Sequence, residues 1–223
     1  MKSYTVRHTD DPVPLTATVE GPWTDADVAR IDEFNWYESG PRPVTEVRAV
    51  YDDRALYLQY DVEDDHISSQ VTDLHGPIHT DSCVECFATP NPGENANYLN
   101  FEANPCGFFK MAWMEPGWSL RGIGREYLPK DLAAEVEIET SEPGPTRDPT
   151  AEDERWWLAA RFPFETLSAL TGLVLAPSSG DRWRANFHRT GVESRSQEAS
   201  WNPIGTEDKQ FHSPGHFGWL RFE

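Results

Sequence analysis

The sequence is poor in cysteine. Its 223 residues include only Cys83, Cys86 and Cys106, an odd number that gives no disulfide framework. Cys83 and Cys86 lie three residues apart in a segment that alternates like a β-strand, so their side chains point to opposite faces and form no zinc-binding pattern. We expect buried free thiols.

Basic residues and long apolar runs are also scarce. The chain has 19 Lys and Arg against 38 Asp and Glu, a formal charge of −19. Such a field repels phosphate backbones and anionic lipid, so we expect neither a nucleic-acid nor a membrane partner. No run approaches the ~20 apolar residues of a membrane span. Residues 1–8 lack the apolar segment of a signal peptide, which predicts a cytoplasmic protein for the chain as written, or a secreted one if a signal was removed.

Alternating segments and turn residues dominate what is present. The clearest pair is a hairpin of residues 44–51 and 55–62 around a polar turn, and an earlier strand is expected at 13–19. Residues 164–172 form the one persuasive short helix, closed by a glycine, and a helical turn is expected within 23–31. The pattern predicts a single all-β domain over 1–223, a two-sheet antiparallel β-sandwich of the DOMON or jelly-roll kind with one or two short helices.

Two further predicted strands, residues 81–87 and 98–104, have polar side chains on one face. In 98–104 Asn100 and Glu102 alternate with apolar residues, and in 81–87 Glu85 stands in mid-strand, where a simple core strand avoids a carboxylate. His188 belongs to a third polar row in 183–190. These rows fit either an ordinary half-solvated sheet or a polar floor that recognises a ligand.

An acidic turn follows the second hairpin strand. Asp61, Asp64 and Asp65 supply crowded oxygens that could hold a structural calcium ion. The segment lacks the spacing of a calcium loop, so a solvated turn is the preferred interpretation and calcium the alternative.

Four ordered segments carry a resemblance to a known family. They are Tyr51-Asp52-Asp53 with Leu56-Tyr57-Leu58, then Asp81-Ser82-Cys83-Val84-Glu85-Cys86-Phe87, then Ser200-Trp201-Asn202-Pro203, and finally His216-Phe217-Gly218-Trp219-Leu220. In this order they resemble the family 9 carbohydrate-binding modules and their stand-alone relatives. The resemblance implies a β-sandwich related to the DOMON group and the binding of sugars, in the best-known members the reducing ends of plant-wall β-glycans. Those members also carry structural calcium.

The resemblance assigns roles to individual residues. It implies Glu85 and Asn100 as sugar-binding polar groups and Trp201 as an aromatic platform. The family closes a sugar ring between two tryptophans, but the position of the first reads Pro77-Ile78-His79 here. The candidates for the missing wall are Trp36, Trp113 and Trp118; a surface plug is the preferred interpretation for Trp36.

Sugar chemistry agrees with these residue types. A pyranose offers apolar C–H faces that stack on tryptophan and hydroxyl groups that need paired donors and acceptors. Glu102, His188 and Arg189 could serve the hydroxyls beside Glu85 and Asn100. We therefore expect non-catalytic binding of a mono- or oligosaccharide, through a site of Trp201, Glu85, Asn100, Glu102, His188, Arg189 and Trp113. The oligomeric state is not indicated.

Two other functions remain open. A carbohydrate-active enzyme, either a glycoside hydrolase or a lyase, could use Asp81, Glu85, Glu102 or His188 as acid and base. A haem-binding DOMON-type domain could use Met111, Met114 or His188 as axial ligands.

Overall fold

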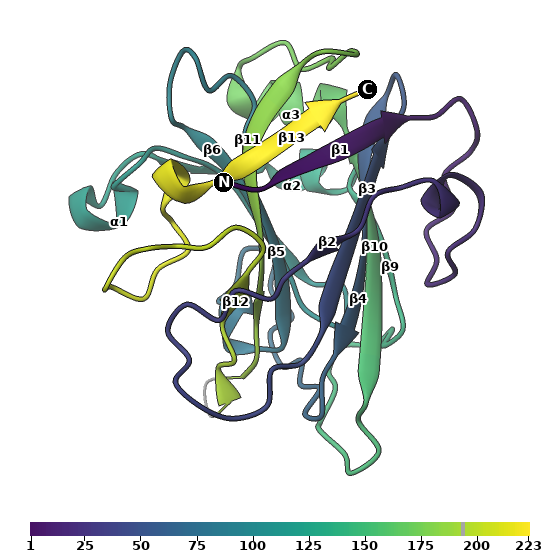
Figure 1. The fold of residues 1–223 in the computed structure, drawn as a ribbon, viewed down its shortest axis with the longest axis vertical. Helices are drawn as coiled ribbons and strands as arrows, with labels where there is room; N and C mark the ends of the chain where they lie inside the picture. Colours follow the sequence, from purple (N-terminus) through teal and green to yellow (C-terminus); the bar gives the residue numbers. More distant parts are fainter. Residues whose placement is uncertain (193–194) are drawn as a thin grey trace.

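The computed structural model of the chain describes residues 1–192 and 195–223 and is mostly β (Figure 1). Thirteen strands form in these residues: β1 Ser3–His8, β2 Ala29–Arg30, β3 Thr45–Tyr51, β4 Ala55–Glu63, β5 Cys83–Thr89, β6 Tyr98–Ala103, β7 Phe109–Met114, β8 Arg125–Tyr127, β9 Glu137–Thr140, β10 Arg155–Pro163, β11 Arg182–Thr190, β12 Ala199–Ser200 and β13 Gly218–Phe222. The helices are α1 Trp118–Arg121, α2 Lys130–Ala133 and α3 Phe164–Thr171, with 3-10 turns η1 Gly21–Thr24, η2 Ile78–Thr80 and η4 Pro214–His216.

The strands pair in one continuous, curled path. Its order is β8-β7-β6-β5-β11-β13-β1-β3-β4-β10-β9, with β2 added to β3 and β12 added to β11. Strand β1 joins the two halves, because Ser3–Val6 pair with β13 and Arg7 and His8 pair with β3. Both ladders of β1 are parallel, so the structure differs there from two separate antiparallel sheets.

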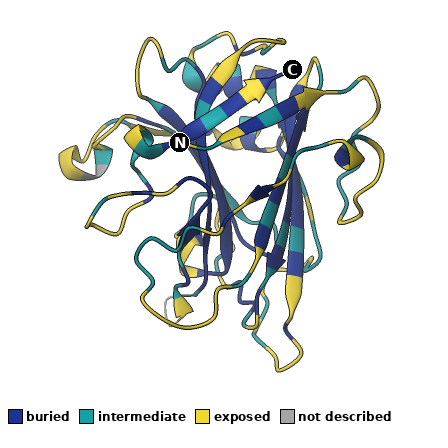
Figure 2. Cartoon of the chain, viewed as in Figure 1, coloured by how far each residue is buried: buried dark blue, intermediate teal, exposed yellow. Residues whose placement is uncertain are grey.

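The two halves of this path face each other across the core. In Figure 1 strands β5, β6 and β11 stand opposite β3, β4 and β10, and β1 and β13 cross one end. Figure 2 shows that the facing sides are buried. Phe101 on β6 meets Phe162 on β10 edge to face, with ring centroids 4.7 Å apart. The hydroxyl of Tyr60 on β4 donates a 3.0 Å hydrogen bond to the backbone carbonyl of Glu85, which ties β5 to the opposite half.

Local sequence explains the elements that were predicted. The hairpin of β3 and β4 is confirmed, and the carboxylate of Asp52 accepts from the backbone N–H groups of Arg54 and Ala55 at 2.8 and 2.7 Å. Helix α3 is confirmed and ends at Gly172, whose φ of 69° is accessible to glycine at little cost. The expected strand at 13–19 is wrong: these residues form no strand, and the first strand is β1.

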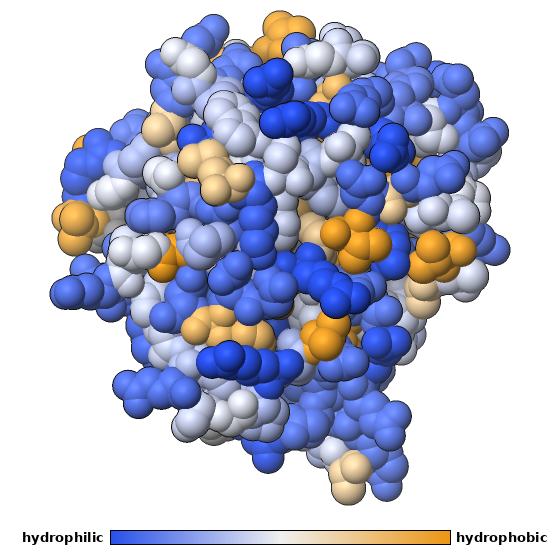
Figure 3. Space-filling model, in the orientation of Figure 1, coloured by the Kyte–Doolittle hydropathy of each residue, from blue (hydrophilic) through white to orange (hydrophobic). Residues whose placement is uncertain are grey.

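The face of the molecule seen in Figure 3 is mostly hydrophilic, with apolar side chains scattered over it. Cys83 and Cys86 are buried free thiols and Cys106 is partly buried. None of the helices in residues 1–192 and 195–223 is long and apolar enough to span a membrane.

Candidate functional site

A row of polar side chains crosses four neighbouring strands. Residues that stand opposite each other in an antiparallel ladder point to the same face. His188 on β11 stands opposite Glu85 on β5, Glu85 opposite Glu102 on β6, and Glu102 opposite Lys110 on β7. This polar row lies on the outer face of the sheet, because the alternate residues of the same strands, such as Cys86 and Phe101, lie in the main core.

A cavity of about 610 Å³ opens above this row, within the ~300–1,000 Å³ typical of small-molecule sites. Glu85, Glu102 and Lys110 line it from the strands. Trp36 reaches it from the loop before β3, and Trp118 from α1. The wall is completed by residues of mixed polarity, namely His79, Thr80, Met114, Arg125, Thr190, Gly191, Ser196, Glu198 and residues 209–212.

Glu102 is held by a buried network. Its carboxylate accepts from the Lys110 ammonium at 2.8 Å and from the side-chain amide of Asn100 at 3.1 Å. The side chains of Glu102 and Lys110 are 5% and 11% exposed, so this ion pair is largely desolvated. His79 lies at the rim, 4.0 Å from the same carboxylate. Glu102 is therefore already partnered.

Glu85 differs from Glu102 although the two stand side by side. It is 3% exposed, yet among the described residues no hydrogen bond or ion pair engages its carboxylate. Burial raises the pKa of Glu85 well above the usual glutamate range; the Glu102 carboxylate raises it further, and the Lys110 ammonium opposes the shift. The carbonyl oxygen of Asn100 is likewise buried without a partner in the described chain. The Glu85 carboxylate, which lines the cavity, can accept hydrogen bonds from a ligand, whereas Asn100 does not line it.

Aromatic rings form the upper part of the cavity. Trp36 packs on Phe211 with ring centroids 5.6 Å apart and donates from its indole N–H to the backbone carbonyl of Thr206 at 2.9 Å. Trp118 donates from its indole N–H to the Tyr98 hydroxyl at 3.2 Å. These hydrogen bonds fix both indoles while leaving each in contact with the cavity.

His212 completes a chain of hydrogen bonds that starts at Trp118. Its Nδ1 lies 2.9 Å from the Tyr98 hydroxyl, and its ring stacks on Phe87 at 5.0 Å. Burial lowers the pKa of His212 to about 4, so the imidazole is neutral at neutral pH. Because the Trp118 indole only donates, the Tyr98 hydroxyl accepts from it. The same hydroxyl can donate to Nδ1 of the His212 tautomer that carries its proton on Nε2.

Comparison with known proteins decides the family. The model of carbohydrate-binding family 9 matches residues 23–222. The chain belongs to this family. No relative was found among curated proteins.

Three solved structures share the fold. A proposed carbohydrate-binding protein from Bacteroides uniformis ATCC 8492 superposes with a TM-score of 0.82 at 24% identity, over 100% of this chain and 99% of that one. A family 9 module from Caldicellulosiruptor kristjanssonii in complex with cellotriose gives 0.64 at 16% identity, over 100% and 94%. The same module in complex with glucose gives 0.63 at 16%, over 100% and 96%.

The structure brings together only part of the site that the sequence predicts. Glu85 and Glu102 line the cavity, and Asn100 lies beside them through its hydrogen bond to Glu102. His188 belongs to the same row but is fully buried, stacked on Phe211 at 4.2 Å, and it does not line the cavity. Burial lowers the pKa of His188 well below its ordinary value, so this ring is a neutral, covered member of the floor.

Three predicted site residues point into the core instead. Trp201 is 4% exposed and packs against Tyr4 and Phe187 of the main core. Its neighbour Ser200 pairs with His188 on the outer face, so period-two alternation turns Trp201 inward. Trp113 packs against the same core.

The third such residue, Arg189, is fully buried on the core side. Its guanidinium lies 3.7 Å from the Asp64 carboxylate and 3.4 Å from the backbone carbonyl of Glu63. The family's aromatic platform at Trp201 is thus not available on the cavity side, and Trp36 and Trp118 are the tryptophans that line the cavity. The sequence-based preference for Trp36 as a surface plug does not fit this position.

The acidic residues outside the cavity hold loops in place. Asp81 is 2% exposed and accepts from the backbone N–H groups of Gln70 and Val71, both at 3.0 Å, and from the Asn104 amide at 2.9 Å. It does not line the cavity with the glutamates, so the acid–base set of Asp81, Glu85, Glu102 and His188 is not assembled in one place.

The three aspartates considered for calcium lie beside different arginines. Asp61 pairs with Arg155 at 3.1 Å and Asp65 with Arg195 at 2.9 Å. Asp64 accepts from the Ser82 hydroxyl at 2.9 Å and lies near Arg189. Within the described ranges no group of three or more His, Cys, Asp or Glu is placed to hold a metal ion. These contacts do not favour calcium at these positions, where it stays a prediction.

The haem candidates are also separated. Met111 lies in the main core, whereas Met114 lines the cavity, because residues three apart on a strand point to opposite faces. His188 is covered by Phe211. The three residues do not converge on one space.

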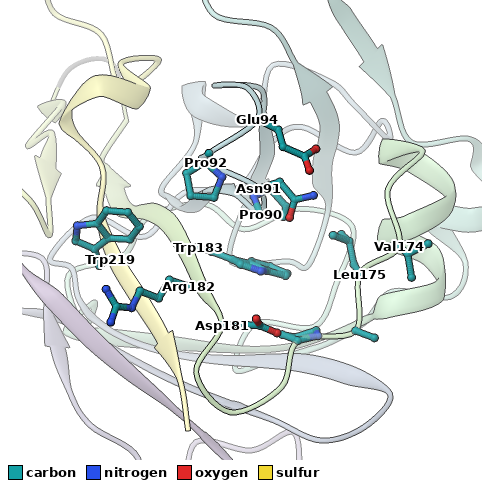
Figure 4. A pocket seen from close by; sticks show the side chains of 13 residues that line it. Pro90, Asn91, Pro92, Glu94, Val174, Leu175, Asp181, Arg182, Trp183 and Trp219 are labelled. Atoms are coloured by element: carbon teal, nitrogen blue, oxygen red, sulfur yellow. The ribbon is translucent and has the colours of Figure 1, made fainter.

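A second, more open pocket of about 430 Å³ lies elsewhere on the sheet (Figure 4). Trp219 and Arg182 border it on one side and Val174 on the other, with Trp183 between them. Its residues are not shared with the first cavity. Trp219 therefore offers a tryptophan outside the candidate site for comparison.

Proposed function

We propose that the cavity above the polar row binds a mono- or oligosaccharide without cleaving it. The observation that carries this proposal is Glu85, a buried carboxylate that faces the cavity with no protein partner in the described chain. A carboxylate that opens into a cavity and lacks a protein partner has hydrogen-bonding capacity that a ligand there can use. A sugar hydroxyl is a donor of suitable chemistry.

The rest of the cavity supports the same ligand class. Trp36 and Trp118 line the cavity and offer apolar rings to the C–H face of a pyranose. The family membership agrees with this chemistry. Glucose and cellotriose, which the Caldicellulosiruptor module binds in its structures, are the first ligands to test, and a reducing chain end is the proposed binding unit.

Binding is measured by calorimetric titration of the protein with glucose and with cellotriose. We expect saturable binding, and Trp118→Ala is expected to weaken it about tenfold, because one stacked aromatic ring contributes ~0.5–1.5 kcal/mol or more. Trp36→Ala is expected to act in the same direction. Trp219→Ala is the matched control, since this indole lies at the other pocket.

Catalysis is tested on the same mixtures. Chromatography after long incubation is expected to recover the oligosaccharide intact. New products that disappear in Glu85→Gln would show that the cavity is catalytic. An equal loss of affinity in Trp219→Ala would place the sugar outside this cavity.

A further inference from the structure

The arginine at the edge of the cavity is held in an unusual way. Arg125, on β8, places its guanidinium 4.5 Å from the ring centroid of Trp118 and 4.8 Å from that of Tyr127. In the described chain it forms no ion pair with a carboxylate, although acidic residues outnumber basic ones two to one, at 38 to 19. Cation–π contacts position the guanidinium, and its N–H donors, on an exposed side chain, remain open to a ligand.

The two lysines that line the cavity each lie close to a carboxylate. Lys110 pairs with Glu102 at 2.8 Å, and Lys209 lies 3.8 Å from Glu198. Glu85 lines the cavity from the floor without a cationic partner of its own. Arg125 is the lining cation that has no carboxylate partner among the described residues, so its guanidinium is open to an anionic ligand.

A guanidinium at the edge of a sugar-sized cavity is well placed to bind a carboxylate. Its planar fork of N–H donors matches a carboxylate in a bidentate arrangement. The indole of Trp118, against which it is stacked, also lines the cavity and can contact the sugar ring. A carboxylate at the edge of a pyranose would satisfy both groups together.

We propose that Arg125 binds the carboxylate of a uronic acid, so that the saccharide recognised in this cavity is acidic. The inference rests on the proposed function and narrows its ligand class. A neutral sugar can hydrogen-bond to the polar row, but it offers no anionic group to the Arg125 guanidinium. A uronic acid uses both the floor and Arg125.

Three matched sugars test this assignment by calorimetry. Glucuronate carries the carboxylate, glucuronamide replaces it with a neutral amide of the same shape, and glucose lacks it. We expect glucuronate to bind about 10- to 100-fold more tightly than glucuronamide, the range of a charge-assisted hydrogen-bonded contact. Added salt is expected to weaken glucuronate binding and to leave glucose binding unchanged.

Variants of Arg125 test whether this residue causes the preference for glucuronate over glucuronamide. Arg125→Gln is expected to remove it, and Arg125→Lys to keep only part of it, because an ammonium lacks the planar fork. Arg221→Gln, an exposed arginine on β13, makes the same change of charge away from the cavity and is expected to leave the preference intact. Circular dichroism confirms that each variant is folded before it is titrated.

The outcomes separate this inference from the proposed function. Equal affinity for glucuronate and glucuronamide, or a preference that survives in Arg125→Gln, would overturn the role of Arg125 while leaving sugar binding in place. Tighter binding of glucose 6-phosphate than of glucuronate would overturn the assignment of a carboxylate. Absence of binding by any sugar would overturn the proposed function itself, and the inference with it.

Discussion

Replacing Glu85 by glutamine is expected to stabilise the folded protein at neutral pH and to weaken its binding of saccharides. The folded state raises the pKa of Glu85 through burial, so the ionised carboxylate is disfavoured there. Stability linked to this group is fully present below its ordinary pKa of about 4.3 and is lost as the pH rises through the folded value. Glutamine has the same shape and does not ionise, so it avoids this loss.

The expected gain follows from the contacts of Glu85. No hydrogen bond in the described chain compensates its carboxylate, and Glu102 repels it, whereas Lys110 is already engaged with Glu102. We expect Glu85→Gln to raise the free energy of unfolding by ~1–2 kcal/mol at pH 7, because glutamine removes the cost of ionising a buried carboxyl, about 1.4 kcal/mol for each unit by which the pKa is raised. For a chain of this size that corresponds to roughly 2–4 °C per kcal/mol in melting temperature.

Thermal melts of the wild type and of Glu85→Gln between pH 4 and pH 8 measure this effect. The difference is expected to be largest at pH 7–8 and to vanish toward pH 4, where Glu85 is protonated in both states. The binding free energy of glucose or glucuronate at pH 7 is expected to weaken by ~1–3 kcal/mol, because the substitution alters the Glu85 oxygen that accepts a hydrogen bond from a sugar hydroxyl.

Glu102→Gln provides the matched control on the neighbouring strand. It leaves the Lys110 ammonium, whose side chain is 11% exposed, without its carboxylate, and we expect a loss of about 3 kcal/mol in stability. The two substitutions are chemically identical and are expected to act in opposite directions. A lower melting temperature for Glu85→Gln at pH 7, or a difference that does not change with pH, would refute the reasoning about burial.

Three further predictions concern other residues. Trp201→Ala is expected to destabilise the protein by ~3–5 kcal/mol, because it removes a core ring packed on Tyr4 and Phe187; denaturant unfolding measures this, and an unchanged midpoint would contradict the core assignment. Tyr98→Phe removes the hydroxyl between the Trp118 indole and His212 and is expected to weaken sugar binding several-fold with a stability loss of ~1 kcal/mol; unchanged affinity would show that Trp118 needs no such support. If calcium is bound at the acidic segment 61–65, a chelator will lower the melting temperature, and identical melts with chelator and with added calcium would exclude it.

The polar row could be predicted in large part from the sequence. Period-two alternation placed Glu85, Asn100 and Glu102 on faces that the structure brings together, because a strand's geometry fixes the face of each residue. The pairing of β11 with β5, which adds His188 to the row, depends on long-range contacts. Alternation within one strand carries no information about which strands become neighbours.

The walls of the cavity could not be predicted in the same way. Lys110 lies among apolar residues in β7, and only its register with Glu102 shows that it belongs to the site. Arg125 and His212 lie on a three-residue strand and a loop, where no periodic signal exists. Trp201 was assigned by resemblance to the family, but its place next to Ser200 turns it toward the core.

The most direct test of sugar recognition in this cavity is a crystal structure of the protein soaked with glucuronate. The account predicts a pyranose above the polar row, with a hydroxyl donating to Glu85, a ring face on Trp118 or Trp36, and the carboxylate at Arg125. A sugar bound at the Trp219 pocket, or an empty cavity at a concentration that saturates binding in solution, would contradict it.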